Sequence, residues 1–223
     1  HVVWREIEFN KIINKLPTHQ QKYFMKMFNY SVYTCDYKRK SMWVDPRVKE
    51  EYEKREKSKY CLDMIIEDKG SDITKIVPKL SLKGKYDLIV QVLHAMQILR
   101  EKGYSHGDLQ HGNITYTKTN TTNNNIEIYG QKIKTKYIYS LIDYGWAGCA
   151  KFYKKKSELK DFNDNFKNNG DMNRFINRII MQQTLLYNFH INNKIKIPKF
   201  SDTKTLLQEL YKDRDLWYKI KNI

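Results

Sequence analysis

The sequence predicts an α+β fold, and two features of its hydrophobic pattern support this prediction. Short apolar stretches typical of strands lie in the first third of the chain and again before residue 145. Helical periodicity governs the stretches between and after them. The chain has 223 residues, of which 40% are apolar, so it can bury a core as one large domain or two small ones.

The first third of the sequence contains one predicted helix and two predicted strands. Apolar residues recur at roughly helical spacing over residues 4–16, and Pro17 ends this helix because proline cannot continue it. Residues 22–37 alternate loosely, as a strand does, and residues 60–68 form a short apolar run that leads into a turn. The charged residues 39–60 between the two predicted strands predict a solvent-exposed loop.

The clearest helix covers residues 85–104, with Gly103 as its stop signal. Its apolar residues fall on one face: Leu88, Ile89, Val92, Leu93, Met96 and Leu99. Beyond it the pattern predicts a hairpin that ends near residue 145, a lysine-rich loop and two further helices (126–145, 151–169, 170–189 and 201–220). We found no internal repeat.

Composition limits the partners and the compartment. The formal net charge of +16 predicts attraction to polyanions such as nucleic acid, acidic proteins or phosphates, although a merely solvated basic surface explains it equally well. Cys35, Cys61 and Cys149 are widely spaced, which predicts reduced thiols in a cytosol-like compartment. No apolar run predicts a membrane span, and no signal peptide is recognisable. The chain begins at His1 rather than Met, so we expect further residues upstream.

Two groups of polar residues carry chemistry. Asp108 and Asn113 follow the long helix, and Asp143 follows an apolar stretch that ends in Ile142. Two carboxylates and an amide from adjacent loops suit phosphoryl transfer: one carboxylate orients the attacking hydroxyl, while the other and the amide oxygen hold Mg²⁺. Gly145 after Asp143 permits the sharp turn that such a loop needs.

These motifs resemble those of the protein-kinase-like superfamily. The stretch HGDLQHGNI (106–114) resembles the catalytic loop H-x-D-L-x-x-x-N, and IDYG (142–145) resembles the D-F-G motif with Tyr in place of Phe. The strand before 68 resembles the hinge strand, with Ile66 near the gatekeeper position. The helix over 4–16 resembles the one that carries the ion-pairing glutamate, for which we expect Glu8, with Glu6 as the second choice.

The resemblance implies a kinase-like α+β fold in two parts. Residues 1–66 would supply the end of the N-lobe, and residues 67–223 the mainly helical C-lobe. It implies ATP- and Mg²⁺-dependent phosphorylation of protein Ser or Thr hydroxyls, with Asp108 orienting the hydroxyl. Asn113 and Asp143 would bind Mg²⁺. The nucleotide contacts would be Glu67, Asp68 and Lys69, whose backbone holds the adenine, together with Glu8.

The long insertion between Asn113 and Asp143 is similar to that of kinase-like proteins from large DNA viruses. A viral origin would place the protein in the host cytoplasm or in the virion, where virion components, nucleic acid or an acidic protein substrate are the expected partners. The lysines at 151–160 would then receive an acidic partner, or simply form a solvated activation-type loop.

Several departures from the kinase pattern leave alternatives open. Gly107 replaces the usual Arg, Gln110 replaces the usual Lys, and neither a Gly-rich loop nor a V-A-I-K lysine occurs in the chain. A small-molecule kinase and a catalytically inactive pseudokinase or structural virion component therefore remain alternatives to a protein kinase. The resemblance also implies that His106 packs near the IDYG backbone, and that Asp171 serves as the buried Asp of the next helix.

Overall fold

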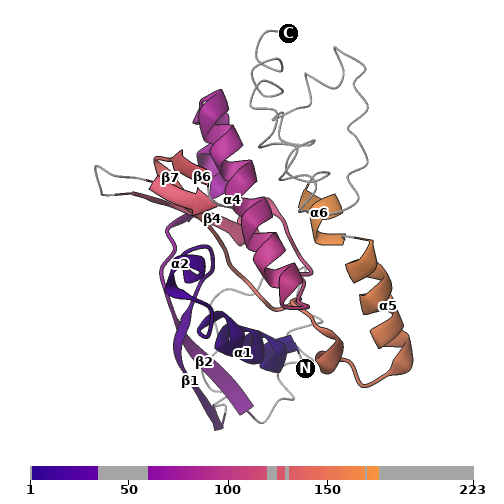
Figure 1. Ribbon diagram of the computed structural model, residues 1–223. Helices are drawn as coiled ribbons and strands as arrows, with labels where there is room; N and C mark the ends of the chain where they lie inside the picture. Colours follow the sequence, from indigo (N-terminus) through magenta and orange to yellow (C-terminus); the bar gives the residue numbers. More distant parts are fainter. Residues whose placement is uncertain (1, 35–59, 120–124, 129–130, 169, 176–223) are drawn as a thin grey trace. The chain divides into compact units, whose positions relative to one another are not determined.

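The computed structural model describes residues 2–34, 60–119, 125–128, 131–168 and 170–175. Helices and small antiparallel sheets are mixed, which confirms the predicted α+β class (Figure 1). The chain forms two compact units: residues 27–67 make the smaller one, and residues 1–26 with those from 68 onward make the larger one. The first helix belongs to the larger of these units, and the division into an N-lobe and a C-lobe stays a prediction.

The smaller unit is an antiparallel pair of strands. Strand β1 (Met27–Thr34) pairs with β2 (Tyr60–Ile66), with Val32 opposite Leu62, which confirms both predicted strands. Cys61 in β2 is disulfide-bonded, whereas Cys149 of the larger unit is a buried free thiol. The expectation of three reduced cysteines is therefore wrong for Cys61. The solvent-exposed loop predicted at 39–60 lies outside the described residues except for Tyr60.

Helix α1 (Val2–Ile13) supplies one wall of the larger unit's core. Its buried residues Phe9 and Ile13 belong to the main core cluster. The helix ends before Pro17, as predicted, and α2 (Thr18–Gln21) is a single turn. Phe24 then forms a parallel bridge to Leu141, which joins this N-terminal segment to the strand that precedes Asp143.

Helix α4 (Leu82–Glu101) runs through the larger unit, and its predicted apolar face is buried. The Ser81 hydroxyl accepts a hydrogen bond from the Gly84 amide at 3.2 Å and caps the helix. At the other end Gly103 adopts a positive φ of 78°, and the Tyr104 amide donates to the Leu99 carbonyl at 2.9 Å. This is the Schellman ending that the glycine predicted. Two short 3₁₀ turns, η2 (Ile73–Lys75) and η3 (Val77–Lys79), precede the helix.

A three-stranded antiparallel sheet with the order β3-β4-β7 packs beside α4. It consists of β3 (Ser71–Asp72), β4 (Ile114–Lys118) and β7 (Tyr137–Leu141). The insertion between β4 and β7 contains the predicted hairpin, in which β5 (Asn125–Ile128) pairs with β6 (Gln131–Lys134).

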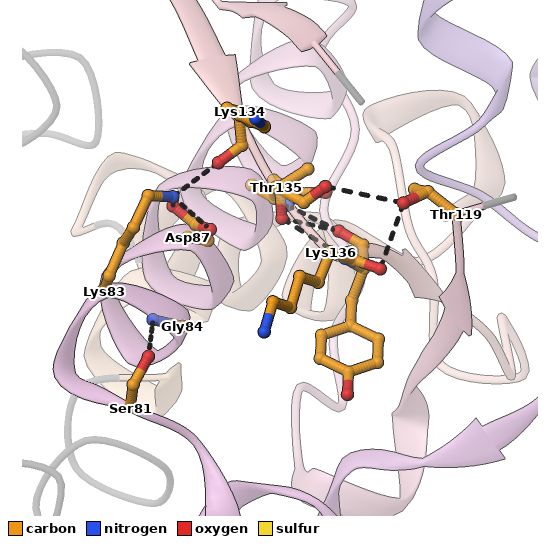
Figure 2. Close-up of polar contacts among 10 residues, drawn as sticks. Ser81, Lys83, Gly84, Asp87, Thr119, Lys134, Thr135 and Lys136 are labelled. Atoms are coloured by element: carbon orange, nitrogen blue, oxygen red, sulfur yellow. Dashed lines mark hydrogen bonds and ion pairs between the residues drawn. The ribbon is translucent and has the colours of Figure 1, made fainter. Parts of the chain in front are cut away.

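Polar side chains of α4 hold this insertion in place. The Lys83 ammonium pairs with the Asp87 carboxylate at 2.9 Å and also donates to the Lys134 carbonyl at the end of β6 (Figure 2). One turn further along α4, the buried Gln91 donates to the Tyr137 carbonyl at 3.0 Å. Burial raises the pKa of Asp87, and the Lys83 ammonium opposes this effect. The hairpin is thus fixed to the helix that leads into the candidate site.

The lysine-rich segment contains a helix. Over part of the predicted loop, the structure has a 3₁₀ turn, η5 (Ala150–Phe152), and helix α5 (Lys156–Lys167). The loop prediction is wrong there because Phe162 and Phe166, four residues apart, stack at 5.6 Å and make an apolar stripe. The Arg100 guanidinium of α4 donates to the Phe166 carbonyl at 2.6 Å and lies over its ring. Helix α5 is therefore anchored on α4.

The described chain closes with α6 (Gly170–Phe175), the start of the helix predicted from residue 170. Its continuation, and the helix predicted at 201–220, lie outside the described residues. Among the helices that the structure describes, none has the length and apolar character required to cross a membrane.

Candidate active site

The segment that begins at Ser105 is held against the segment that follows Asp143. Ser105 and Gly148 exchange two backbone hydrogen bonds of 2.9 and 3.0 Å. The Schellman ending of α4 directs the chain into this bridge. The two sequence motifs are therefore adjacent in the larger unit, although the long insertion separates them in the chain.

His106 connects the two motifs from inside. The residue is fully buried, and its Nε2 atom lies 2.9 Å from the Ile142 carbonyl oxygen. Its ring also makes an edge contact with Tyr144, with 5.8 Å between centroids. These contacts give His106 the structural position expected next to the IDYG backbone.

Gly107 occupies a position that no other residue fits. Its φ is +81°, which L-residues with a side chain rarely adopt. A Cβ added here would overlap the Trp146 carbonyl oxygen and lie 2.9 Å from the carbonyl carbon. The absence of an arginine before Asp108 therefore has a steric reason in this fold.

Asp108 and Asn113 contact each other directly. The Asn113 amide nitrogen donates to the backbone carbonyl of Asp108 at 2.8 Å and to its carboxylate at 3.1 Å. The Gln110 side chain donates to the same carboxylate oxygen at 3.0 Å. Asn113 is buried at the end of the 3₁₀ turn η4 (His111–Asn113), whereas Asp108 is partly exposed. The carboxylate is thus held in place while it remains accessible.

Asp143 lies beside this pair and faces solvent. The Ile142 amide donates to the Asn113 carbonyl at 3.0 Å, so the two motifs share a backbone hydrogen bond. Asp143 has a φ of +59°, the only positive value among the described non-glycine residues, and its carboxylate accepts from the Gly145 amide at 3.2 Å. Such a conformation costs about 1–3 kcal/mol and is concentrated at functional sites.

Tyr144 anchors the turn that presents Asp143. The side chain is fully buried, and its hydroxyl donates to the Leu141 carbonyl at 2.7 Å. Its ring packs on Phe9 of α1 with 4.8 Å between centroids. Tyr144 is thus fixed in the core, whereas the preceding Asp143 is exposed.

Asp171 supports the loop from α6. Its two carboxylate oxygens accept the backbone amides of His106 at 2.6 Å and Gly107 at 2.9 Å. Asp171, predicted from the sequence to be the buried Asp of the next helix, has a side chain that is 13% exposed. Arg174, one turn later, donates to the Gly107 carbonyl. Sequence reasoning missed Arg174, although its spacing of three residues from Asp171 on a helix was a usable signal.

The glutamate of α1 that faces the site is Glu6, not Glu8. The Glu8 side chain is 53% exposed and pairs with Lys11 at 2.7 Å. Burial, followed by the negative charge of Asp143, raises the pKa of Glu6, and a hydrogen bond with the Tyr144 backbone lowers it. Helical spacing explains the difference, since Glu6 shares its face with the buried Phe9 and Ile13.

The three expected adenine contacts lie where the chain passes from one unit to the other. Glu67 ends the smaller unit, whereas Asp68 and Lys69 resume the larger one. The Asp68 carboxylate accepts the Gly70 amide at 2.7 Å and so closes a turn. Adenine binding by these residues stays a prediction.

The donor set suits a hard cation. Asp143 offers an exposed carboxylate, and Asn113, whose amide nitrogen is engaged by Asp108, offers its amide oxygen. Mg²⁺ is commonly held by one or two such oxygen ligands together with substrate phosphates and water. Within the described ranges, no three His, Cys, Asp or Glu side chains gather as ligands for an ion such as zinc.

Comparison of the sequence with protein-family models and with curated proteins found no match.

Proposed function

We propose that this protein transfers the γ-phosphoryl group of ATP to a protein Ser or Thr hydroxyl in a Mg²⁺-dependent reaction. One observation carries the proposal: Asp108, Asn113 and Asp143 lie in two loops joined by the Asn113–Asp108 and Ile142–Asn113 hydrogen bonds. The same order of residues in the sequence resembles the kinase-like motifs. Phosphoryl transfer requires positioning and charge stabilisation more than covalent chemistry, and these groups provide both.

Each residue has a separate role in this mechanism. The Asp108 carboxylate accepts the hydrogen bond of the attacking hydroxyl and orients it, while Gln110 and Asn113 fix the carboxylate. Asn113 and Asp143 would hold Mg²⁺, which supplies positive charge to the phosphate oxygens when bound. Glu6 is the α1 carboxylate best placed to receive a lysine that positions the phosphates.

The first test is the Asp108→Asn variant of the full-length protein in a radiolabelled-ATP assay. Asn keeps the size of the side chain but cannot act as a carboxylate, so we expect a loss of transfer of at least a hundredfold. The melting temperature should stay within about 2 °C, because Asp108 is partly exposed and outside the core. Unchanged transfer in this variant would refute the role of Asp108.

The acceptor should carry negative charge near its hydroxyl. Lysine side chains are exposed along the segment that follows the site. Trp146, at the start of this segment, is 63% exposed, and its backbone carbonyl lies next to Gly107. The exposed lysines are Lys151, Lys154, Lys155, Lys156 and Lys160. Transfer to acidic peptides should exceed transfer to basic peptides, and the preference should weaken with salt.

Small-molecule acceptors give a second candidate function, which the glycine at position 107 favours. A panel of hydroxyl-bearing metabolites in the same ATP assay separates the two candidates. A protein that binds nucleotide but transfers to neither class would be a pseudokinase. Residence in the host cytoplasm or the virion, with partners there, belongs to the same proposal.

A further inference from the structure

One turn of α6 holds the backbone on the two sides of Gly107. Before the Gly107 Cα, the Asp171 carboxylate accepts the amides of His106 and Gly107. After it, in the peptide group that joins Gly107 to Asp108, Arg174 donates to the Gly107 carbonyl, and its guanidinium lies 3.8 Å from the Asp171 carboxylate. Asp171 and Arg174 are spaced i,i+3 on α6, so a single helical turn holds three consecutive polar groups of the loop.

Gly107 makes this grip necessary. Glycine has more backbone freedom than any other residue, because it has no side chain to restrict the peptide group that follows. The orientation of that peptide sets the direction of the Asp108 Cα–Cβ bond. Asp171 fixes the amides that precede the peptide, and Arg174 is the side chain that holds its carbonyl.

We infer that Arg174 is a positioning residue, which sets the direction of the Asp108 carboxylate by holding the Gly107 carbonyl. Its kinetic part rests on the proposed function. The amide of the same peptide, that of Asp108, donates to His106 Nδ1 at 3.4 Å. A charge-assisted hydrogen bond is stronger than a neutral one, so the guanidinium has the larger effect on the orientation of the peptide. An error of about 1 Å in such a group can cost about a hundredfold in rate.

The test compares Arg174→Met and Arg174→Lys with a matched control, Arg100→Met. Arg100 also donates from its guanidinium to a backbone carbonyl, that of Phe166, but it does not touch the catalytic loop. Hydrogen–deuterium exchange of the peptide that covers residues 104–110 reports on the grip without any need for activity. Steady-state kinetics with ATP and an acceptor report on the direction of Asp108.

We expect Arg174→Met to speed exchange in this peptide about tenfold and to lower kcat at least tenfold, with KM for ATP within about twofold. Arg174→Lys should recover part of both losses, and Arg100→Met should change neither. Exchange that is unchanged in Arg174→Met, or equally fast in Arg100→Met, overturns the inference. If Arg174→Met does not fold, the Arg174→Lys variant decides by the same readouts.

The two proposals fail in different ways. A wild-type protein that transfers no phosphoryl group contradicts the proposed function, whereas the exchange comparison still decides whether Arg174 holds the loop. A drop in kcat without faster exchange contradicts the inference and leaves the proposed function standing.

Discussion

Replacement of Gly107 by alanine tests whether the close contact with Trp146 shapes the loop that carries Asp108. Two costs add in this variant. An alanine at φ +81° pays roughly 1–2 kcal/mol for the left-handed conformation. The new Cβ also overlaps the Trp146 carbonyl, so the segment must move and the two Ser105–Gly148 hydrogen bonds are lost, at about 1 kcal/mol each. We expect a total loss of about 3–4 kcal/mol.

Gly103 offers a matched control for the first cost. Its φ of +78° is nearly the same, but a Cβ at this position has no neighbour within 4 Å. Gly103→Ala should therefore lose only the roughly 1–2 kcal/mol of backbone strain. The difference between the two variants isolates the contact with Trp146.

Urea unfolding followed by circular dichroism measures both variants. If the contact with Trp146 shapes the loop, Gly107→Ala is less stable than Gly103→Ala by about 2 kcal/mol. Equal stabilities would refute it, because the backbone conformation alone would then explain the glycine at 107.

Three further predictions concern pH, metal and regulation. Burial, and then the positive charge of Lys22, lowers the pKa of His94 to about 4, so the stability it contributes is present above pH 6.5 and lost as the pH falls toward 4. In urea unfolding, the free energy of unfolding should fall by about 3 kcal/mol over this pH range, and this loss should be absent in His94→Phe. An identical pH profile in both proteins would contradict the lowered pKa of His94. ATP should raise the melting temperature only when Mg²⁺ is present, and at an ATP concentration of a hundred times Kd the stabilisation should be about 2.7 kcal/mol. Asp143→Ala should abolish this shift. A shift that does not depend on the metal would exclude Asp143 as a metal ligand. Ser157→Ala should keep kcat within about twofold, and a tenfold loss would show that phosphorylation of this serine activates the protein.

The elements with a strong hydrophobic period were predictable, and those defined by a few contacts were not. Helix α4 was predicted closely because six apolar residues mark its face and Gly103 its end. Helix α5 was missed because its apolar stripe consists of only two phenylalanines in a lysine-rich segment, too few to give a helical period. Its helical state depends on tertiary contacts, such as that between Arg100 and Phe166, which local sequence does not contain.

The candidate site divides in the same way. The sequence motifs predicted that the segments of Asp108, Asn113 and Asp143 lie together, and the structure joins these segments by hydrogen bonds. The choice between Glu6 and Glu8 depends on which face of α1 is buried: Glu8 is 53% exposed and pairs with Lys11, whereas the charge of Asp143 acts on Glu6. The reason for Gly107 also required the structure, since the Trp146 carbonyl that excludes a side chain is distant in sequence.

The packing of the segment after Asp143 explains why we expect no phosphorylation switch. Phosphate in an activation loop acts by ordering a mobile segment through a contact with arginine. In this protein Phe162 of α5 already packs against Gly148, which is bridged to Ser105, and Arg100 holds the other end of α5. Ser157 is exposed in the first turn of α5, N-terminal to Phe162 and Phe166, through which the helix is anchored. Since apolar contacts and backbone bridges already order this segment, a phosphate at Ser157 would add little further order. In addition, the Trp146 carbonyl excludes from position 107 the arginine that would bind such a phosphate.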